Sequence, residues 1–276
     1  MDKIVIPPLK CQGIKTKLVS FIKDTFMYNN KGIWFEPFVG TGAVVFNINP
    51  KRAILSDKNE HNINFYNQIQ LGNITKNIVR DFLEYHGEKL KVEGQDYYLK
   101  MRKEFNETHD SLLYLFLNRS DFNGMIRFNK KGYFNVPYCH NDNRFSKAYI
   151  TKICNQVNAV AEIIQFKDWE FRACPWQETF KLVSKNDFIY LDPPYIGRDT
   201  SYVGEWSESE AIELSKYAHE TNGHVCLSMW KENKFRKNEH LIQYWSDFAW
   251  YEQKHFYHIG AKESNRHEMI EVLAIK

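Results

Sequence analysis

The chain has 276 residues and a mass of 32.9 kDa, enough to bury a full core in one large domain or in a domain with an insert. Its hydrophobic share of 43% and charged share of 26% are ordinary for a globular protein, and no apolar run reaches the ~18 residues of a membrane-spanning helix. The first ten residues also lack the features of a signal peptide. We therefore expect no membrane span and a location in the cytoplasm. The net charge of +3 by itself indicates no partner.

The cysteines are scattered without C-x-x-C spacing, which predicts free thiols and neither a zinc site nor a disulfide framework. We expect no bound metal. The distribution of charge is more informative, because residues 100–152 contain ten Lys and Arg against five Asp and Glu, a local charge of +5. A solvated face is the default explanation of such a segment, and a nucleic-acid surface is the alternative.

Helix and strand patterns alternate in the first third of the chain. Helical spacing covers residues 16–28 and 43–48, and strand-like runs cover residues 33–38 and 53–56. This order is typical of a βαβ unit.

The middle of the chain, from about residue 62 to 148, has a different character. Helical patterns cover residues 74–85 and 112–117. Residues 118–143 are polar, punctuated by glycine and rich in aromatic side chains, which is typical of an ordered functional loop or hairpin.

The alternation resumes after Tyr149. Helices are predicted up to about residue 164 and at 207–221, and strands at 170–173, 188–191 and 225–229. The runs 248–259 and 269–275 are expected to form an antiparallel pair at the edge of the sheet. The pattern predicts one α/β domain, residues 1–62 and 149–276, interrupted by an inserted unit at 63–148.

The most informative motif is Asp192-Pro193-Pro194-Tyr195, directly after the apolar run 188–191. Its position predicts that a parallel strand delivers these residues to a cleft. A carboxylate, a turn carbonyl and an aromatic face can together hold a flat amine such as that of adenine and present its nitrogen for alkylation. A carboxylate that only caps the turn is the alternative.

A second motif, residues 35–42, ends a predicted strand and opens a helix. Gly40 and Gly42 permit a tight turn and close approach of a ligand to the backbone, although a βα turn without a ligand has the same composition. Asp57 stands at the end of the next strand, where an acid can accept hydrogen bonds from ribose hydroxyls. The turn lacks G-K-[ST], so it is no nucleotide triphosphate loop.

These motifs resemble those of the S-adenosylmethionine-dependent amino-methyltransferases of the α group, and more closely the Dam-like, D12 class DNA adenine-N6 methyltransferases. The similarity covers residues 10–15 (K-C-Q-G-I-K), 38–42 (F-V-G-T-G), 118–129 (N-R-S-D-F-N-G-M-I-R-F-N), 132–138 (G-Y-F-N-V-P-Y) and 192–195. The resemblance implies a Rossmann-like methyltransferase domain with a mixed, mostly parallel sheet and an inserted, mainly helical target-recognition domain with a hairpin loop.

The resemblance also implies roles for single residues. Asp192 and the Pro193 carbonyl would accept the two hydrogens of the adenine amine, and Tyr195 would stack on the base, which the enzyme would flip out of the duplex. The implied residues of the methyl-donor site are Lys15, Glu36, Phe38, Gly40, Gly42, Asp57 and Asp192.

In the insert, the resemblance implies that Arg127 recognises a guanine in the major groove and that Phe122 and Asn123 enter the duplex or hold the orphaned base. Phe122 as a buried loop anchor is the alternative. Lys130, Lys131 and Arg144 would bind phosphates. The full set of residues expected at DNA is Lys10, Arg119, Phe122, Asn123, Arg127, Asn129, Lys130, Lys131, Pro137 and Arg144.

Two segments depart from the family pattern. Cys174-Pro175-Trp176 stands where an acid often holds the donor's adenine amine, so either Glu178 substitutes for that acid or donor binding is weak. Residues 138–141 replace the usual glycine and basic residues, which affects recognition of the outer bases.

The leading hypothesis is therefore methylation of adenine N6 in double-stranded DNA, within GATC or another site that contains GA. The expected enzyme is a monomer. Whether a restriction endonuclease that acts separately accompanies it is left open by the sequence. The alternatives are an RNA adenine or cytosine-N4 methyltransferase, and a DNA-binding module whose donor site has decayed.

Overall fold

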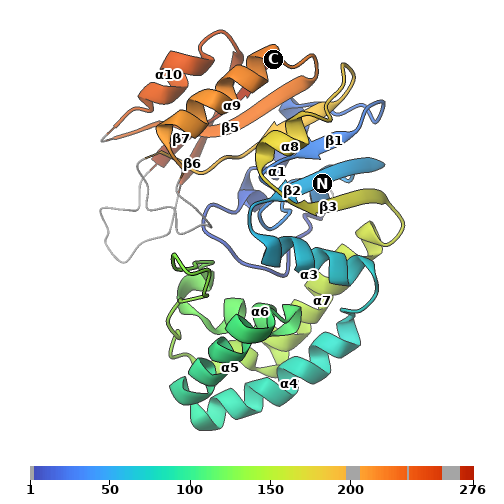
Figure 1. Cartoon of the computed structure of the whole chain (residues 1–276), viewed down its shortest axis with the longest axis vertical. Coiled ribbons are helices and arrows are strands. Elements are labelled where there is room, and N and C mark those ends of the chain that lie inside the picture. Colours follow the sequence, from blue (N-terminus) through green and yellow to red (C-terminus); the bar gives the residue numbers. More distant parts are fainter. Residues whose placement is uncertain (1–2, 197–205, 235, 257–267) are drawn as a thin grey trace.

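The structure, a computed structural model, describes residues 3–196, 206–234, 236–256 and 268–276 (Figure 1). Its centre is a seven-stranded sheet in the order β3-β2-β1-β4-β5-β7-β6. The strands are β1 (Trp34–Glu36), β2 (Arg52–Asp57), β3 (Asp168–Ala173), β4 (Phe188–Leu191), β5 (His224–Asn233), β6 (Ala249–Phe256) and β7 (Glu268–Ile275). Strands β1 to β5 pair in parallel, whereas β7 pairs antiparallel with β5 and β6.

The sheet confirms the predicted Rossmann-like fold, because its first five strands follow the 3-2-1-4-5 order of doubly wound sheets. The predicted antiparallel pairing of the last two runs is also confirmed. Of these two strands, β7 lies inside the sheet and β6 lies at its edge. Residues 257–259 of the predicted run lie outside the described residues.

Helices lie on both faces of the sheet and in a separate layer below it (Figure 1). The helices of the first half are α1 (Val19–Thr25), α2 (Val45–Ile48), α3 (Glu60–Gln70), α4 (Lys76–Glu93), α5 (Gln95–Thr108) and α6 (Ser111–Ser120). Those of the second half are α7 (Lys147–Ile164), α8 (Trp176–Phe180), α9 (Glu208–Glu220) and α10 (Glu239–Trp245).

The strands are buried on both faces because neighbouring residues point to opposite sides. Trp34 of β1 packs into a core with α1, α2 and α3, whereas Phe35 packs into a core with α8, α9 and α10. In β4, Tyr190 joins the first core, and Ile189 and Leu191 join the second. Continuous apolar runs of this kind are typical of parallel strands covered on both sides.

The inserted part is mainly helical, as predicted, with α4, α5 and α6 in the lower layer (Figure 1). Helices α3, α5, α8 and α10 were not assigned from the sequence. Asn59 begins α3 by accepting the His61 N–H at 3.1 Å, and Gly94 begins α5 with a positive φ of 58°. The boundaries at 63 and 148 stay a prediction, because one hydrophobic core runs from the sheet, at Leu55, into the helical layer, at Leu83.

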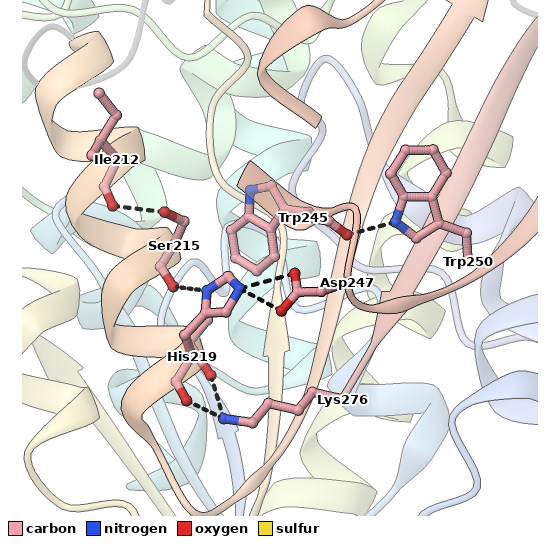
Figure 2. Close-up of polar contacts among 8 residues, drawn as sticks. Ile212, Ser215, His219, Trp245, Asp247, Trp250 and Lys276 are labelled. Atoms are coloured by element: carbon pink, nitrogen blue, oxygen red, sulfur yellow. Dashed lines mark hydrogen bonds and ion pairs between the residues drawn. The ribbon is translucent and has the colours of Figure 1, made fainter. Parts of the chain in front are cut away.

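The carboxyl end of α9 is held by the side chains of Asp247 and Lys276 (Figure 2). Lys276 Nζ donates to the carbonyls of Ala218, His219 and Thr221, which helix geometry leaves without partners. His219 Nε2 lies 3.0 Å from Asp247 Oδ1, and Nδ1 lies 2.6 Å from the backbone carbonyl of Ser215. The Ser215 hydroxyl donates to the Ile212 carbonyl, and His219 contacts the backbone of Ser215 rather than its hydroxyl. This Ser, His and Asp arrangement is therefore structural and does not activate a nucleophile.

Candidate functional site

Lys15 and Asp192 form an ion pair at the carboxyl end of the sheet. Lys15 Nζ lies 2.8 Å from Asp192 Oδ1, and the lysine side chain is 5% exposed. The same ammonium donates to the Tyr195 hydroxyl and to the Gly13 carbonyl, each at 3.3 Å, and lies 5.4 Å from the Tyr195 ring centroid. The structure thus brings together three residues that the sequence separates by up to 180 positions.

Each partner offsets part of the cost of burying the other. Burial alone would lower the pKa of Lys15, but Asp192, together with the smaller effects of Tyr195, Glu271 and Tyr190, outweighs it and holds that pKa well above its usual value. Burial raises the pKa of Asp192, and Lys15 opposes the shift.

Two further acids are buried beside this pair. Glu36, at the end of β1, accepts the indole N–H of Trp34 at 3.1 Å, and burial raises its pKa well above the usual range. Glu271 on β7 is 1% exposed, and its charge raises the pKa of both Tyr195 and Asp192 beyond the effect of burial. Sequence reasoning missed Glu271; one acid inside the apolar run 269–275 was the available signal.

The turn between β1 and α2 has the glycine conformations that the sequence predicted. Gly40 and Gly42 have φ angles of 51° and 73°, in the region that favours glycine. A Cβ at Gly42 would stand 2.5 Å from the Phe46 ring, whereas a Cβ at Gly40 would meet nothing within 4 Å. Gly42 is thus required by packing, and Gly40 leaves open space beside the backbone.

Asp57 closes this turn from the end of β2. Its carboxylate accepts the Gly40 N–H at Oδ2 and the Asn59 N–H at Oδ1, each at 2.8 Å. Burial raises its pKa, and these two hydrogen bonds oppose the shift. The acid predicted from the sequence therefore lies at the glycine turn.

Aromatic rings line the other side of the turn. The ring of Phe38 lies 5.5 Å from Trp206, edge to face, and 6.4 Å from buried Trp176. Pro175 begins α8 and supplies no acid. Glu178, the expected substitute, is about half exposed and pairs with Lys181 at 2.6 Å.

The predicted functional loop contains a tight turn, Phe122–Gly124, which we call the recognition turn. Asn123 and Gly124 both have φ of 64°, which asparagine and glycine tolerate best. Phe122 is 51% exposed, so it is no buried anchor, and its N–H donates to the Pro137 carbonyl at 2.9 Å.

A hairpin follows the turn and carries Arg127. Phe128 and Phe134 form a bridge, and Asn129 Oδ1 accepts the N–H groups of Lys131 and Tyr133 at the tip. Arg127 Nε and Nη2 donate to Asn135 at 2.7 and 2.9 Å, which fixes the plane of its guanidinium group.

The basic residues expected at DNA lie in different surroundings. Lys130 and Lys131 are exposed at the hairpin tip. Lys10 and Arg144 are half-buried, and burial lowers the pKa of Lys10 to about 8. Arg119 is 5% exposed and donates to the Pro8 carbonyl and to Gln156 Oε1.

Asp121 is a buried acid beneath the recognition turn, 1% exposed. Burial raises its pKa to about 9, and the charge of Lys10 only partly opposes the shift. Between about pH 4, where this carboxyl ionises in the unfolded chain, and pH 9, the folded protein retains a proton that the unfolded chain has lost. Stability therefore falls as the pH rises through this window.

We expect Asp121→Asn to remove that dependence. The gain in unfolding free energy over the wild-type protein should be larger at pH 8 than at pH 5, as measured by urea unfolding. Asp96→Asn, an exposed acid on α5, is the control and should show no such difference. An equal effect of Asp121→Asn at both pH values would contradict the protonated state.

Within the described ranges, no three His, Cys, Asp or Glu side chains are grouped so that they could hold a metal ion. None of the helices in these ranges is long and apolar enough to cross a membrane.

The fold and the site define a class of protein. A Rossmann-like sheet that carries a glycine turn with a carboxylate partner and a D-P-P-Y sequence at β4 is typical of amino-methyltransferases. The chain matches the model of the D12 class N6 adenine-specific DNA methyltransferases over residues 12–259. It belongs to this family of enzymes.

Named relatives agree with this assignment. A DNA adenine methylase of Haemophilus influenzae is 32% identical over 72% of this chain and 67% of its own length. One from Vibrio cholerae is 35% identical, but the match covers 61% of this chain and only 60% of that protein. A Type II methyltransferase of Lactococcus lactis is 26% identical over 99% of this chain and 96% of its own length.

Proposed function

We propose that this protein transfers a methyl group from S-adenosylmethionine to N6 of an adenine in double-stranded DNA, after the nucleotide is flipped out of the helix. The observation that carries the proposal is the contact of buried Lys15 with half-buried Asp192 and Tyr195 at the end of β4. It places a carboxylate and an aromatic ring together, as the amine of a flipped base requires.

The residues at the glycine turn suit the donor. The open space at Gly40 admits a ligand against the backbone, and Asp57 lies where it can accept the ribose hydroxyls. Phe38 and Trp206 offer aromatic faces to the adenine part. When bound, the donor supplies an activated methyl group on a sulfonium.

The chain's own residues would orient the target amine. Lys15 contacts Oδ1 of Asp192, so we assign Oδ2 and the Pro193 carbonyl to the two N6 hydrogens. Hydrogen bonds that hold these hydrogens out of the ring plane would favour a pyramidal nitrogen with an available lone pair. As N6 gained the methyl group, the donor's carbon–sulfur bond would break, the thioether would leave, and N6 would lose one hydrogen as a proton. Holding the nitrogen in line with the methyl group supplies much of the rate.

The recognition turn and the hairpin would select the sequence. Exposed Phe122 and Asn123 are suited to enter the duplex, and the planar Arg127 group is suited to the O6 and N7 atoms of a guanine. We propose a site that contains GA, such as GATC, with Lys130, Lys131 and Arg144 on phosphates.

The test is long-read sequencing with modification detection on plasmid DNA from a methylation-free bacterium that expresses the chain. Methylated adenine in one recurring sequence would support the proposal and give the site. Asp192→Ala is the matched control and should leave the plasmid unmodified. Unmodified DNA in the presence of folded wild-type protein would count against the reaction.

We expect Arg127→Ala to relax the choice of base at one guanine, by roughly 1 to 3 kcal/mol. The measurement is the ratio of methylation rates on the cognate duplex and on duplexes with that guanine replaced. Lys130→Ala is the control: it should weaken binding to all duplexes alike, because a phosphate contact carries no sequence information. An unchanged ratio in Arg127→Ala would remove Arg127 from recognition.

The proposal includes a monomer that acts in the cytoplasm, where the DNA substrate lies. The name of the Lactococcus lactis relative, a Type II methyltransferase, supports a restriction endonuclease as a separate partner.

A further inference from the structure

The amino-terminal segment, residues 5–15, connects the recognition turn with the catalytic acid. At one end, Lys10 lies beside Gly124, where an added Cβ would stand 2.6 Å from Lys10 Cβ. At the other end, Lys15 holds Asp192 at 2.8 Å. Only four residues separate the two lysines, so the stretch from Lys10 to Lys15 can span at most about 17 Å.

Asn118, near the carboxyl end of α6, fixes this segment at Lys10. Its Oδ1 accepts the Lys10 N–H at 2.7 Å, and its Nδ2 donates to the Lys10 carbonyl at 2.9 Å. The side chain is completely buried and pairs with both backbone groups, as a neighbouring strand would. Arg119, the next residue, donates to the carbonyl of Pro8.

The segment also contacts the glycine turn. Cys11 Sγ lies 3.8 Å from Thr41 Oγ1, between Gly40 and Gly42. Gly13 has a φ of 78°, and a Cβ there would meet nothing within 4 Å. Its carbonyl accepts from Lys15 Nζ at 3.3 Å. A displacement of Lys10 therefore reaches Lys15 through a short path with one glycine at which the backbone can turn.

A second asparagine fixes the same segment far from the recognition turn. Asn47 of α2 accepts the Val5 N–H at 2.8 Å and donates to the Val5 carbonyl at 2.9 Å. The two asparagines make the same pair of bonds, but only Asn118 stands directly before the recognition turn. The chain thus contains a matched control for the role of Asn118.

We propose that Asn118 is a positioning residue that transmits the docking of the recognition turn on DNA, through Lys10 and residues 11–14, to the Lys15–Asp192 pair. The inference rests on the proposed function. The rate of methyl transfer, and not only the affinity for DNA, then depends on the base at the recognition turn. Arg119 supports the same segment from the protein interior.

The test compares Asn118→Leu, Asn118→Asp and Asn47→Leu with the wild-type protein. Single-turnover methylation is measured on the site found by sequencing and on duplexes with one base changed. Melting temperatures check that each variant is folded. Asn118→Asp keeps the acceptor for the Lys10 N–H and loses the donor to the Lys10 carbonyl. It replaces Asn118→Leu in the comparison if that variant does not fold.

We expect both Asn118 variants to reduce the ratio of cognate to altered-site rates by between about 2-fold and 30-fold, with the larger change in the rate constant rather than in KM. Asn47→Leu should keep the ratio at a similar loss of melting temperature. An unchanged ratio in the Asn118 variants, or an equal loss in Asn47→Leu, would overturn the inference alone. Wild-type protein that methylates no duplex would overturn the proposed function, and the inference with it.

Discussion

Replacing Asp192 by alanine is expected to abolish detectable methyl transfer, a loss of at least about 100-fold, because it removes the carboxylate assigned to one amine hydrogen. Binding to DNA should stay within a few-fold of wild type, since the hairpin that we propose to contact DNA is held by its own hydrogen bonds around Arg127 and Asn129. The measurements are single-turnover methylation and duplex binding on the same preparation.

Two controls refine the Asp192 result. Asp192→Asn keeps the shape of the side chain and one acceptor oxygen but removes the charge that holds Lys15, so it should also be impaired. Asp168→Ala removes an exposed carboxylate at the amino end of β3 and should be fully active. Turnover by Asp192→Ala at the wild-type rate would refute the role of this residue.

Replacing Lys15 by methionine is expected to cost about 3 to 5 kcal/mol of unfolding free energy, because it leaves the carboxylate of Asp192, which is only 22% exposed, without its partner. The raised pKa of Lys15 means that its charged form contributes fully below the unfolded value of about 10.4 and is lost only above the folded value, whereas the raised pKa of Asp192 means that the pair is lost when acid protonates that carboxyl. Urea unfolding at neutral pH therefore measures the whole effect.

Lys15→Met should also change the pH dependence of any remaining activity. Without the ammonium, burial would raise the pKa of Asp192 further, so the acid limb of the rate profile should move to higher pH. Lys58→Met is the matched control: it breaks an ion pair of the same 2.8 Å length with Glu210, but Lys58 is 41% exposed. It should cost no more than about 1 kcal/mol. Equal losses of unfolding free energy in the two variants would show that the Lys15 ion pair stabilises the protein no more than an exposed ion pair does.

Most strands along the chain and the main motifs were predictable from local patterns. Apolar runs such as 188–191 mark buried parallel strands, and glycine or D-P-P-Y after a run marks its carboxyl end. Parallel strands deliver these ends to one edge of the sheet, so the proximity of Gly40 and Asp57 follows from topology.

Other features were not predictable from local patterns. Helix α5 combines polar residues with four buried apolar ones, and only packing against α6 and the hairpin decides its face. The family resemblance placed Arg119 among the residues expected at DNA. In the structure α6 is buried almost all round, and the Arg119 guanidinium group lies inside the protein. A motif does not show on which side of a helix a residue lies.

By itself, the sequence determined the family, because the residues that carry the resemblance stand in short contiguous motifs such as 38–42 and 192–195. Only the tertiary structure decided how those motifs act together. Three contacts bring together residues that are far apart in the chain. They are the Lys15–Asp192 ion pair, the position of Glu271 beside Tyr195, and the two hydrogen bonds between Asn118 and Lys10. Such contacts depend on burial and on the crossing of distant elements, which no local spacing records.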